Sequence, residues 1–172
     1  MKTEAPSTGS SRIRHAASVL LIVLLSPVLL AFALAYLLSW FSFAVVLHLA
    51  IWVGWCSRGK SVLLVYSNSP IWQGYFETHI LPRLGQRAVV LNWSERKNWP
   101  RFSSLAVLAF RCFGGDREFN PLAVVFRPFR LRRTFRFWQP FKQLKHEKPE
   151  AVEAMTMNLF AFLEGTAGKI LA

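Results

Sequence analysis

Charge is scarce in this sequence, and negative charge is scarcer than positive charge. Only 17% of the 172 residues are charged, and 9 acidic residues stand against 21 Lys and Arg residues, so the net charge is +12. Hydrophobic residues make up 53% of the chain, which is a high share for a soluble domain of this size. The positive charge indicates that an anionic surface is nearby or bound.

Cysteine, histidine and catalytic motifs are also in short supply. Cys56 and Cys112 are the two cysteines, and they form neither a disulfide framework nor a C-x-x-C pair, which agrees with a reducing compartment. Four histidines lack the spacing of metal ligands, and the acidic residues lack a recognisable catalytic spacing. No G-x-G-x-x-G or G-x-x-x-x-G-K-[ST] motif follows a predicted strand. The sequence therefore predicts no metal, no cofactor and no catalytic residue.

One long stretch has no charge at all. From Ala16 to Cys56 the chain contains no Asp, Glu, Lys or Arg. A bilayer core about 30 Å thick is crossed by roughly 20 helical residues, and this stretch is about twice that long. The length predicts a membrane-embedded segment at 16–57 that forms a hairpin of two transmembrane helices, near 16–37 and 40–56. One crossing followed by a buried or interfacial helix, and a shallow hairpin, are the alternatives.

Basic residues flank this stretch on both sides. Lys2, Arg12 and Arg14 precede it, and Arg58 and Lys60 follow it. Since basic residues near a membrane segment stay in the cytoplasm, two crossings would leave both ends on that side. The sequence therefore predicts an integral membrane protein whose soluble domain is cytoplasmic.

A cleaved signal peptide is the competing interpretation of the same stretch. The letters "RIRH", "VLLIVLLSPVLL" and "AFALA" supply a basic start, an apolar core and small residues suited to cleavage. The apolar run continues well beyond that point, so cleavage would still leave a membrane segment.

The rest of the chain predicts one α/β domain at 61–164, preceded by a disordered basic segment at 1–15 and followed by a tail at 165–172. Short apolar runs bounded by turn residues predict strands, and amphipathic stretches with Ser, Pro or Gly at their ends predict helices. In chain order these are a buried strand at 61–67, a helix from Ser69 or Pro70 that Pro82 kinks or ends, a buried strand at 87–93, a helix from Ser103 or Ser104 to Gly114, and then strands at 121–126 and 133–141 and a helix at 149–164.

The element order is strand, helix, strand, helix, strand, strand, helix. Helical crossovers between the early strands imply parallel pairing, and the short link between the last two strands implies an antiparallel hairpin. The predicted fold class is α/β: a transmembrane helical hairpin, then a small mixed four-stranded sheet with helices.

Two prolines give this order a resemblance to the thioredoxin-like fold, over residues 61–164. Pro82 falls inside the first helix, where that fold often has a kinking proline. Pro121 directly precedes the third strand, where that fold usually has a cis-proline. The family's redox members carry two cysteines at the start of the first helix, but this sequence reads "SPIWQ" there. The resemblance therefore implies the fold without thiol oxidoreductase chemistry, because disulfide exchange needs a thiolate.

Two polar loops are the candidate binding site. In open α/β sheets, ligands bind beyond the carboxyl ends of the strands, where the loops "SNSPIWQ" and "NWSERKNW" are expected to converge. These loops also suit simple turns and helix caps, so the structural interpretation stays open. The candidate ligand-binding residues are Asn68, Ser69, Gln73, Asn92, Ser94, Glu95 and Arg96.

The segment "FRPFRLRRTFRFW" interleaves phenylalanine with arginine, and no acidic residue occurs between Arg127 and His146. A domain tethered at a bilayer already faces anionic headgroups, so lipid needs no additional partner to account for this charge. A solvated strand face, a phosphorylated or protein ligand, and nucleic acid bound by aromatic stacking are the other interpretations. The predicted contacts to an anionic surface are Arg127, Arg130, Arg132, Arg133, Arg136, Lys142 and Lys145.

These patterns lead to a main hypothesis and an alternative. The main one is a membrane-anchored, non-catalytic thioredoxin-like module that binds membrane-protein partners as an accessory part of a membrane complex. The alternative is a transferase at the membrane surface that acts on a lipid-linked or phosphorylated substrate through the polar loops.

Overall fold

A computed structural model describes residues 8–100, 104–115, 118–144 and 149–165. The chain divides into two compact units, Met1–Val45 and Val46–Ala172. The long helix α1 (Thr8–Gly54) supplies the described part of the first unit, and its last turns belong to the second unit, with the α/β domain. Of the predicted terminal segments, residues 1–7 and 166–172 lie outside the described residues, and α1 already begins at Thr8.

One continuous helix runs through the charge-free stretch as far as Gly54, so the expected hairpin is not confirmed. The predicted turn at "SWFS" contains neither Gly nor Pro, and nothing in those residues interrupts the helical hydrogen bonds. Large apolar side chains are exposed along α1, from Leu20 (61%) to Val45 (43%). In the described part of the chain, the stretch Leu20–Arg58 is long and apolar enough to cross a membrane.

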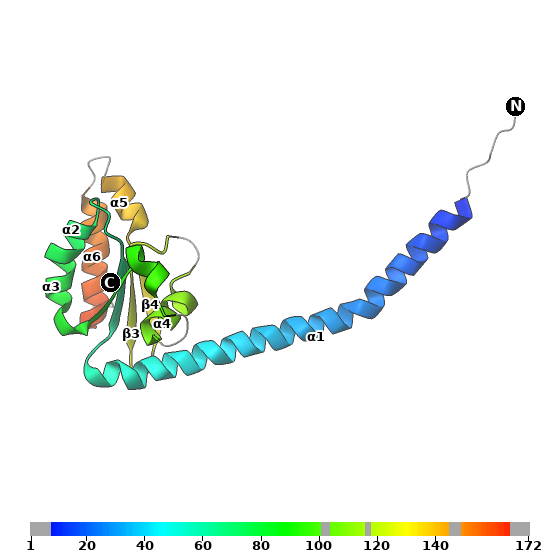
Figure 1. The fold of residues 1–172 in the computed structure, drawn as a ribbon, viewed down its shortest axis with the longest axis horizontal. Coiled ribbons are helices and arrows are strands. Elements are labelled where there is room, and N and C mark those ends of the chain that lie inside the picture. The colour runs from blue at the N-terminus through cyan, green and yellow to red at the C-terminus, as the bar shows by residue number, and fades with distance from the viewer. Residues whose placement is uncertain (1–7, 101–103, 116–117, 145–148, 166–172) are drawn as a thin grey trace, which may run out of the picture. The chain divides into compact units, whose positions relative to one another are not determined.

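A mixed four-stranded sheet forms the centre of the second unit (Figure 1). The strand order is β2-β1-β3-β4; β1 and β2 are parallel, and β3 is antiparallel to both β1 and β4. This confirms the mixed sheet that the element order predicted. The strands are β1 (Val62–Tyr66), β2 (Ala88–Asn92), β3 (Leu122–Arg127) and β4 (Arg130–Arg136).

One face of the sheet is covered by helices from both halves of the domain (Figure 1). The first helical segment comprises α2 (Gln73–Tyr75), a π-helical turn (Phe76–Ile80) and α3 (Leu81–Leu84), and α6 (Glu150–Glu164) lies beside it. Phe76, Leu64 and Leu159 are fully buried in the core that these helices form with β1 and β3. The π-helical turn ends at Ile80, two residues before Pro82, which has no backbone N–H to donate to the preceding turn.

The opposite face is covered by α4 (Leu105–Phe113) and by the last turns of α1. Leu47 and Ile51 of α1 are 4% and 0% exposed, and the His48 and Phe126 ring centroids lie 5.7 Å apart. The end of α1 is therefore part of the hydrophobic core of the domain, although it is the end of the same helix and not the separate second helix of the alternative prediction.

Three predicted elements differ in detail. Helix α2 begins at Gln73 rather than at Pro70, and Ile71 is 41% exposed. Strand β2 is half-buried rather than buried, because it is an edge strand. The fourth strand does not reach Phe141: β4 ends at Arg136, and α5 (Trp138–Leu144) follows, since Pro140 has no N–H to extend the ladder but suits the first turn of a helix.

Candidate functional site

The two polar loops meet, as predicted, at the carboxyl ends of the parallel strands β1 and β2. Tyr66 at the end of β1 pairs with Asn92 at the end of β2, so the loops that follow these residues begin side by side. The Asn92 amide nitrogen donates to Oδ1 of Asn68 over 2.8 Å, and the backbone N–H of Asn68 donates to the Ser94 hydroxyl over 3.1 Å. These hydrogen bonds join the first loop directly to the second.

Asn92 is the centre of this cluster. Its Oδ1 accepts from the Ser94 N–H over 3.0 Å and caps the short 3-10 helix Trp93–Asn98, and its Nδ2 also lies 3.2 Å from a Glu95 carboxylate oxygen. A capping Asn satisfies a backbone N–H that has no partner within the helix. The Asn92 side chain therefore caps a helix and also joins the two loops, so both interpretations of the sequence apply to it.

The remaining candidate residues point elsewhere. Gln73 donates to the Glu77 carboxylate over 3.0 Å, and the Ser69 carbonyl accepts from the Gln73 N–H. Arg96 donates to the Trp93 carbonyl, and its guanidinium carbon lies 5.0 Å from the centroid of the Trp93 ring. The structure therefore joins Asn68, Asn92, Ser94 and Glu95 and leaves Ser69, Gln73 and Arg96 outside their hydrogen bonds.

A second polar group, centred on Ser67 and Asn120, lies beside the first loop. The Ser67 hydroxyl accepts from the Trp72 indole over 3.2 Å and from the Asn120 amide over 2.9 Å. Oδ1 of Asn120 is buried and has no partner among the described residues. Asn120 was not among the predicted site residues, although it directly precedes Pro121, a proline that the sequence already marked as special. The peptide bond between these two residues is cis.

Tyr66 adds the main electrostatic perturbation at this end of the sheet. Burial raises the pKa of its phenol, and the neighbouring Glu77 carboxylate raises this pKa further. Tyr66 therefore remains a neutral hydrogen-bond donor well above neutral pH. The hydroxyls, amides and single carboxylate of the cluster suit ligand binding through hydrogen bonds.

Three shallow hollows among the described residues lie away from this cluster. The largest, about 420 Å³, lies between the first helical segment and α6 and is lined by Tyr75, His79, Arg83 and Glu153, among others. Another, of about 280 Å³, lies where α1 leads into β1, and the third, of about 260 Å³, adjoins Trp93 and Phe110. None of the three is lined by the joined residues Asn68, Asn92, Ser94 and Glu95.

Replacing Asn92 with alanine should loosen this edge of the sheet. We expect a loss of about 1 kcal/mol of stability, because the cap of the 3-10 helix disappears. Amide hydrogen exchange, followed by mass spectrometry, should become faster at Ser94. Asn68→Ala is the matched control, because it removes one link between the loops but keeps the cap. Equal acceleration at Ser94 in both variants would contradict this assignment.

The predicted anionic-surface contacts divide between the two ends of β4. Arg127 and Arg130 are paired at the hairpin tip, whereas Arg136 pairs with Leu122 at the other end and donates to the Glu118 carbonyl. Seven residues of strand span roughly 20 Å. Leu122 also pairs with Val65 near the end of β1, so Arg136 lies at the end of the sheet near the polar loops, and Lys142 lies on α5, which follows β4 at that end. Lys145 lies outside the described residues.

Several of these cations also contact aromatic rings. The Arg132 guanidinium carbon is 4.2 Å from the centroid of Phe113 on α4, whereas that of Arg133 is 5.4 Å from Phe162 on α6. Arg132 and Arg133 therefore lie on opposite faces of the sheet, as the alternation of a strand requires. Such cation–π contacts contribute modestly at exposed sites and leave guanidinium N–H groups able to bind anions.

Comparison of the chain with models of protein families, with curated proteins and with solved structures found no match to any of them.

Proposed function

We propose that this chain is a membrane-anchored, redox-inactive thioredoxin-like module that acts by binding, as an accessory part of a membrane complex. One observation carries the proposal: the anchor and the domain share a helix. Leu20 to Val45 of α1 expose apolar side chains, whereas Ile51 of the same helix is fully buried in the domain core. The last turns of the anchor helix are therefore part of the domain core.

The sheet supports the thioredoxin-like part of the proposal. Its order β2-β1-β3-β4 contains the parallel pair β1–β2 and the antiparallel hairpin β3–β4, followed by α6, which the element order shared with that fold implies. The first helical segment and α6 cover one face of the sheet and α4 covers the other. These observations concern the fold alone, since a fold can serve many functions.

The cysteines support the redox-inactive part. Neither Cys56 nor Cys112 lies at the start of the first helical segment, and both are free. Burial raises the pKa of the Cys112 thiol, with a smaller opposing effect from Arg132. A raised pKa keeps this thiol protonated at neutral pH, whereas disulfide exchange requires a thiolate.

The position of the polar cluster favours a protein partner over a lipid-linked substrate. Strand β1 follows α1 and ends at the cluster, and its five residues span roughly 17 Å. A lipid-linked substrate held at the end of α1 would have to extend along the whole of β1 to reach Asn92. We therefore prefer binding to the alternative transferase activity.

We propose that the domain lies on the cytoplasmic side of a single crossing. A single crossing puts the basic residues before α1 and those after it on opposite sides, so the flanking charges no longer favour one side and the proposal rests on other residues. Two free cysteines suit a reducing compartment. The cations around the β3–β4 hairpin tip suit the anionic inner leaflet, where each adds about 1 kcal/mol of attraction.

Photo-crosslinking tests the binding function. A photoreactive amino acid at Asn68 or Ser94 of the full chain, in its native membrane, should yield a defined adduct with a second protein. Met157, which is 66% exposed on α6, is the matched control position and should yield none. Identical adducts at all three positions, or adducts at none, would contradict binding through the polar loops.

A further inference from the structure

We propose that the tip of the β3–β4 hairpin inserts Phe129 and Leu131 into the bilayer interface, so that the domain contacts the membrane at a second point beside α1. This inference rests on the proposed function in one respect: α1 must be in the bilayer. It adds an apolar contact to the attraction between the cations and the headgroups.

The exposure of the two side chains is the first observation. Phe129 is 92% exposed and Leu131 is 86% exposed, the two highest values among the exposed large hydrophobic residues of the described chain. Phe129 occupies the turn between β3 and β4 and has a positive φ of 59°, an uncommon conformation for a bulky residue. The hairpin thus presents an aromatic and an aliphatic side chain at its end, with neither in the core.

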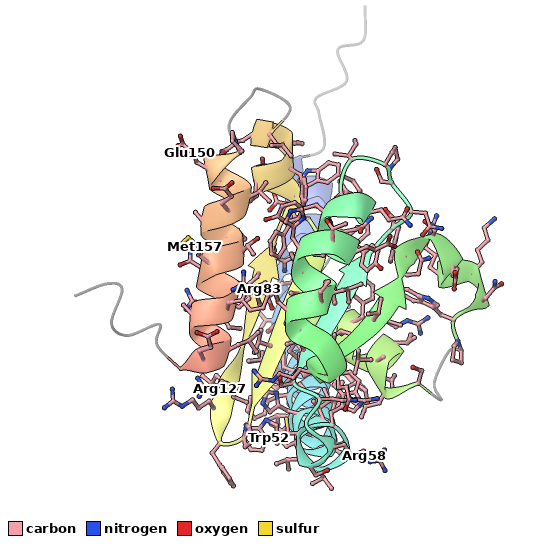
Figure 2. All side chains as sticks on the ribbon, turned by 90° about the vertical axis from the view of Figure 1, so that its left-hand side faces the viewer. Trp52, Arg58, Arg83, Arg127, Glu150 and Met157 are labelled. Carbon is pink, nitrogen blue, oxygen red and sulfur yellow. The ribbon has the colours of Figure 1, made fainter. Side chains whose placement is uncertain are left out.

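The location of the tip is the second observation. The Phe129 ring lies 5.7 Å from the ring of Trp52, a residue in the last turns of α1. The second unit begins at Val46, and Trp52 lies about 9 Å further along the helix, at a rise of 1.5 Å per residue. The tip is therefore close to the point where α1 enters the domain, whatever the direction of the helix before that point. Figure 2 shows Trp52 and Arg58 at the same end of the domain, and Glu150 at the other.

The outer side of the same helical turns is also apolar. Val46 and Val53 are 63% and 75% exposed, and Leu49 between them is 49% exposed. Their spacing places them on one face of α1, and Leu47 and Ile51, on the other side, are buried in the domain. A helix that is apolar all round is typical of a protein core or a membrane rather than of a surface exposed to water. Together with Phe129 and Leu131, these residues give one end of the domain an apolar surface.

The charges around this surface indicate lipid rather than a protein as its occupant. Arg130 lies between Phe129 and Leu131 in the sequence and is exposed, and Arg132 follows on the same strand. Arg58 and Lys60 follow the end of α1 and are exposed as well. Alternating apolar and basic side chains match an anionic interface, where rings enter the acyl boundary and guanidinium groups meet phosphates. The covalent connection to the membrane helix brings this surface to the bilayer.

This contact would fix the orientation of the domain. The hairpin tip and the start of β1 lie at one end of the sheet, and the polar loops follow the other end of β1. With the tip in the interface, the cluster around Asn92 faces the aqueous phase and is accessible to a partner. Arg136 and Lys142, at the far end of β4 and on α5, would not touch the bilayer.

Spin labelling tests the insertion. In the full chain with Cys56→Ala and Cys112→Ala, a nitroxide is attached to Phe129→Cys or, as the control, to Met157→Cys, which lies on α6 away from Trp52 (Figure 2). The protein is reconstituted in vesicles of phosphatidylcholine and phosphatidylglycerol. Power-saturation EPR then measures collisions with oxygen, which partitions into lipid, and with a water-soluble nickel chelate. We expect the ratio of oxygen to nickel collisions to be several-fold higher at 129 than at 157.

Each other outcome overturns the inference. Equal ratios at 129 and 157 would mean that the tip lies in water, and low collision rates with both reagents would mean that a protein covers it. Alkaline carbonate extraction of the same vesicles shows whether α1 itself is anchored in the membrane. If the chain resists extraction but the hairpin tip lies in water, only the inserted tip is disproved and the anchor stands. If the variant without cysteines does not fold, benzoylphenylalanine at 129 in the native background should give adducts with lipid acyl chains, and their absence counts against insertion.

Discussion

Replacing Phe76 with alanine should lower the free energy of unfolding of the domain by about 3–5 kcal/mol. The Phe76 side chain is fully buried between β1 and the helices that cover it. Its ring stacks on Tyr66 with the centroids 5.5 Å apart and meets Phe137 edge-on at 5.2 Å. Alanine would leave a cavity that the surrounding side chains fill only in part. The loss of stability therefore includes the cost of this cavity as well as the lost transfer free energy of the ring.

The matched control is Phe129→Ala, because the same change at a 92% exposed position removes almost no buried area. We expect its stability to stay within about 0.5 kcal/mol of wild type. Both variants are compared as the full chain in mild detergent, with urea unfolding followed by near-UV circular dichroism of the aromatic core. Equal midpoints for Phe76→Ala and wild type would mean that Phe76 lies outside the hydrophobic core.

The α/β domain was largely predictable because its elements carry local signals. The run "SVLLVYS" is apolar throughout and flanked by turn residues, and β1 is buried along its whole length at the centre of the sheet. The paired glycines at 114 and 115 end α4, as expected, and α6 begins directly after Pro149. A chain whose local preferences agree with its fold can be interpreted from such signals.

The end of α1 shows why part of the fold was not predictable. Apolar side chains surround this helix on all sides, so hydrophobic periodicity cannot distinguish the turns that face lipid from those that face protein. Ile51, which is fully buried, and Val53, which is 75% exposed, look alike in the sequence. Only the tertiary contacts with the domain separate them.

The candidate site was predictable in location but not in membership. The rule that loops converge at the carboxyl ends of parallel strands placed Asn68 and Asn92 together correctly. It could not indicate that Gln73 turns toward Glu77, since both side chains lie one turn apart on the same helical segment. Asn120 belongs to the loop before an antiparallel strand, a part of the sheet that this rule does not cover.

Two arginines at the centre of the exposed part of α1, as Leu30→Arg with Leu34→Arg, should remove the chain from the membrane. Both leucines are more than half exposed and lie one helical turn apart. An arginine at the centre of a membrane helix costs about 2.5–3.5 kcal/mol on insertion scales, so the pair costs roughly 5–7 kcal/mol. We expect the variant to pass from the pellet to the supernatant on alkaline carbonate extraction. Leu30→Ile with Leu34→Ile keeps the apolar character and should remain in the pellet.

This pair of arginines also locates the crossing. The residues after Leu34 are charge-free as far as Cys56, so α1 has enough apolar length to shift and cross with its second half instead. Such a shift would withdraw Leu47 and Ile51 from the domain core, which costs energy comparable to emptying buried sites. In a hairpin of two crossings, the second helix near 40–56 would already lie in the bilayer, so it could remain there without withdrawing any residue from the domain core. A carbonate-resistant arginine variant with a folded domain would therefore favour the hairpin, whereas extraction favours the single crossing by a helix whose end belongs to the domain.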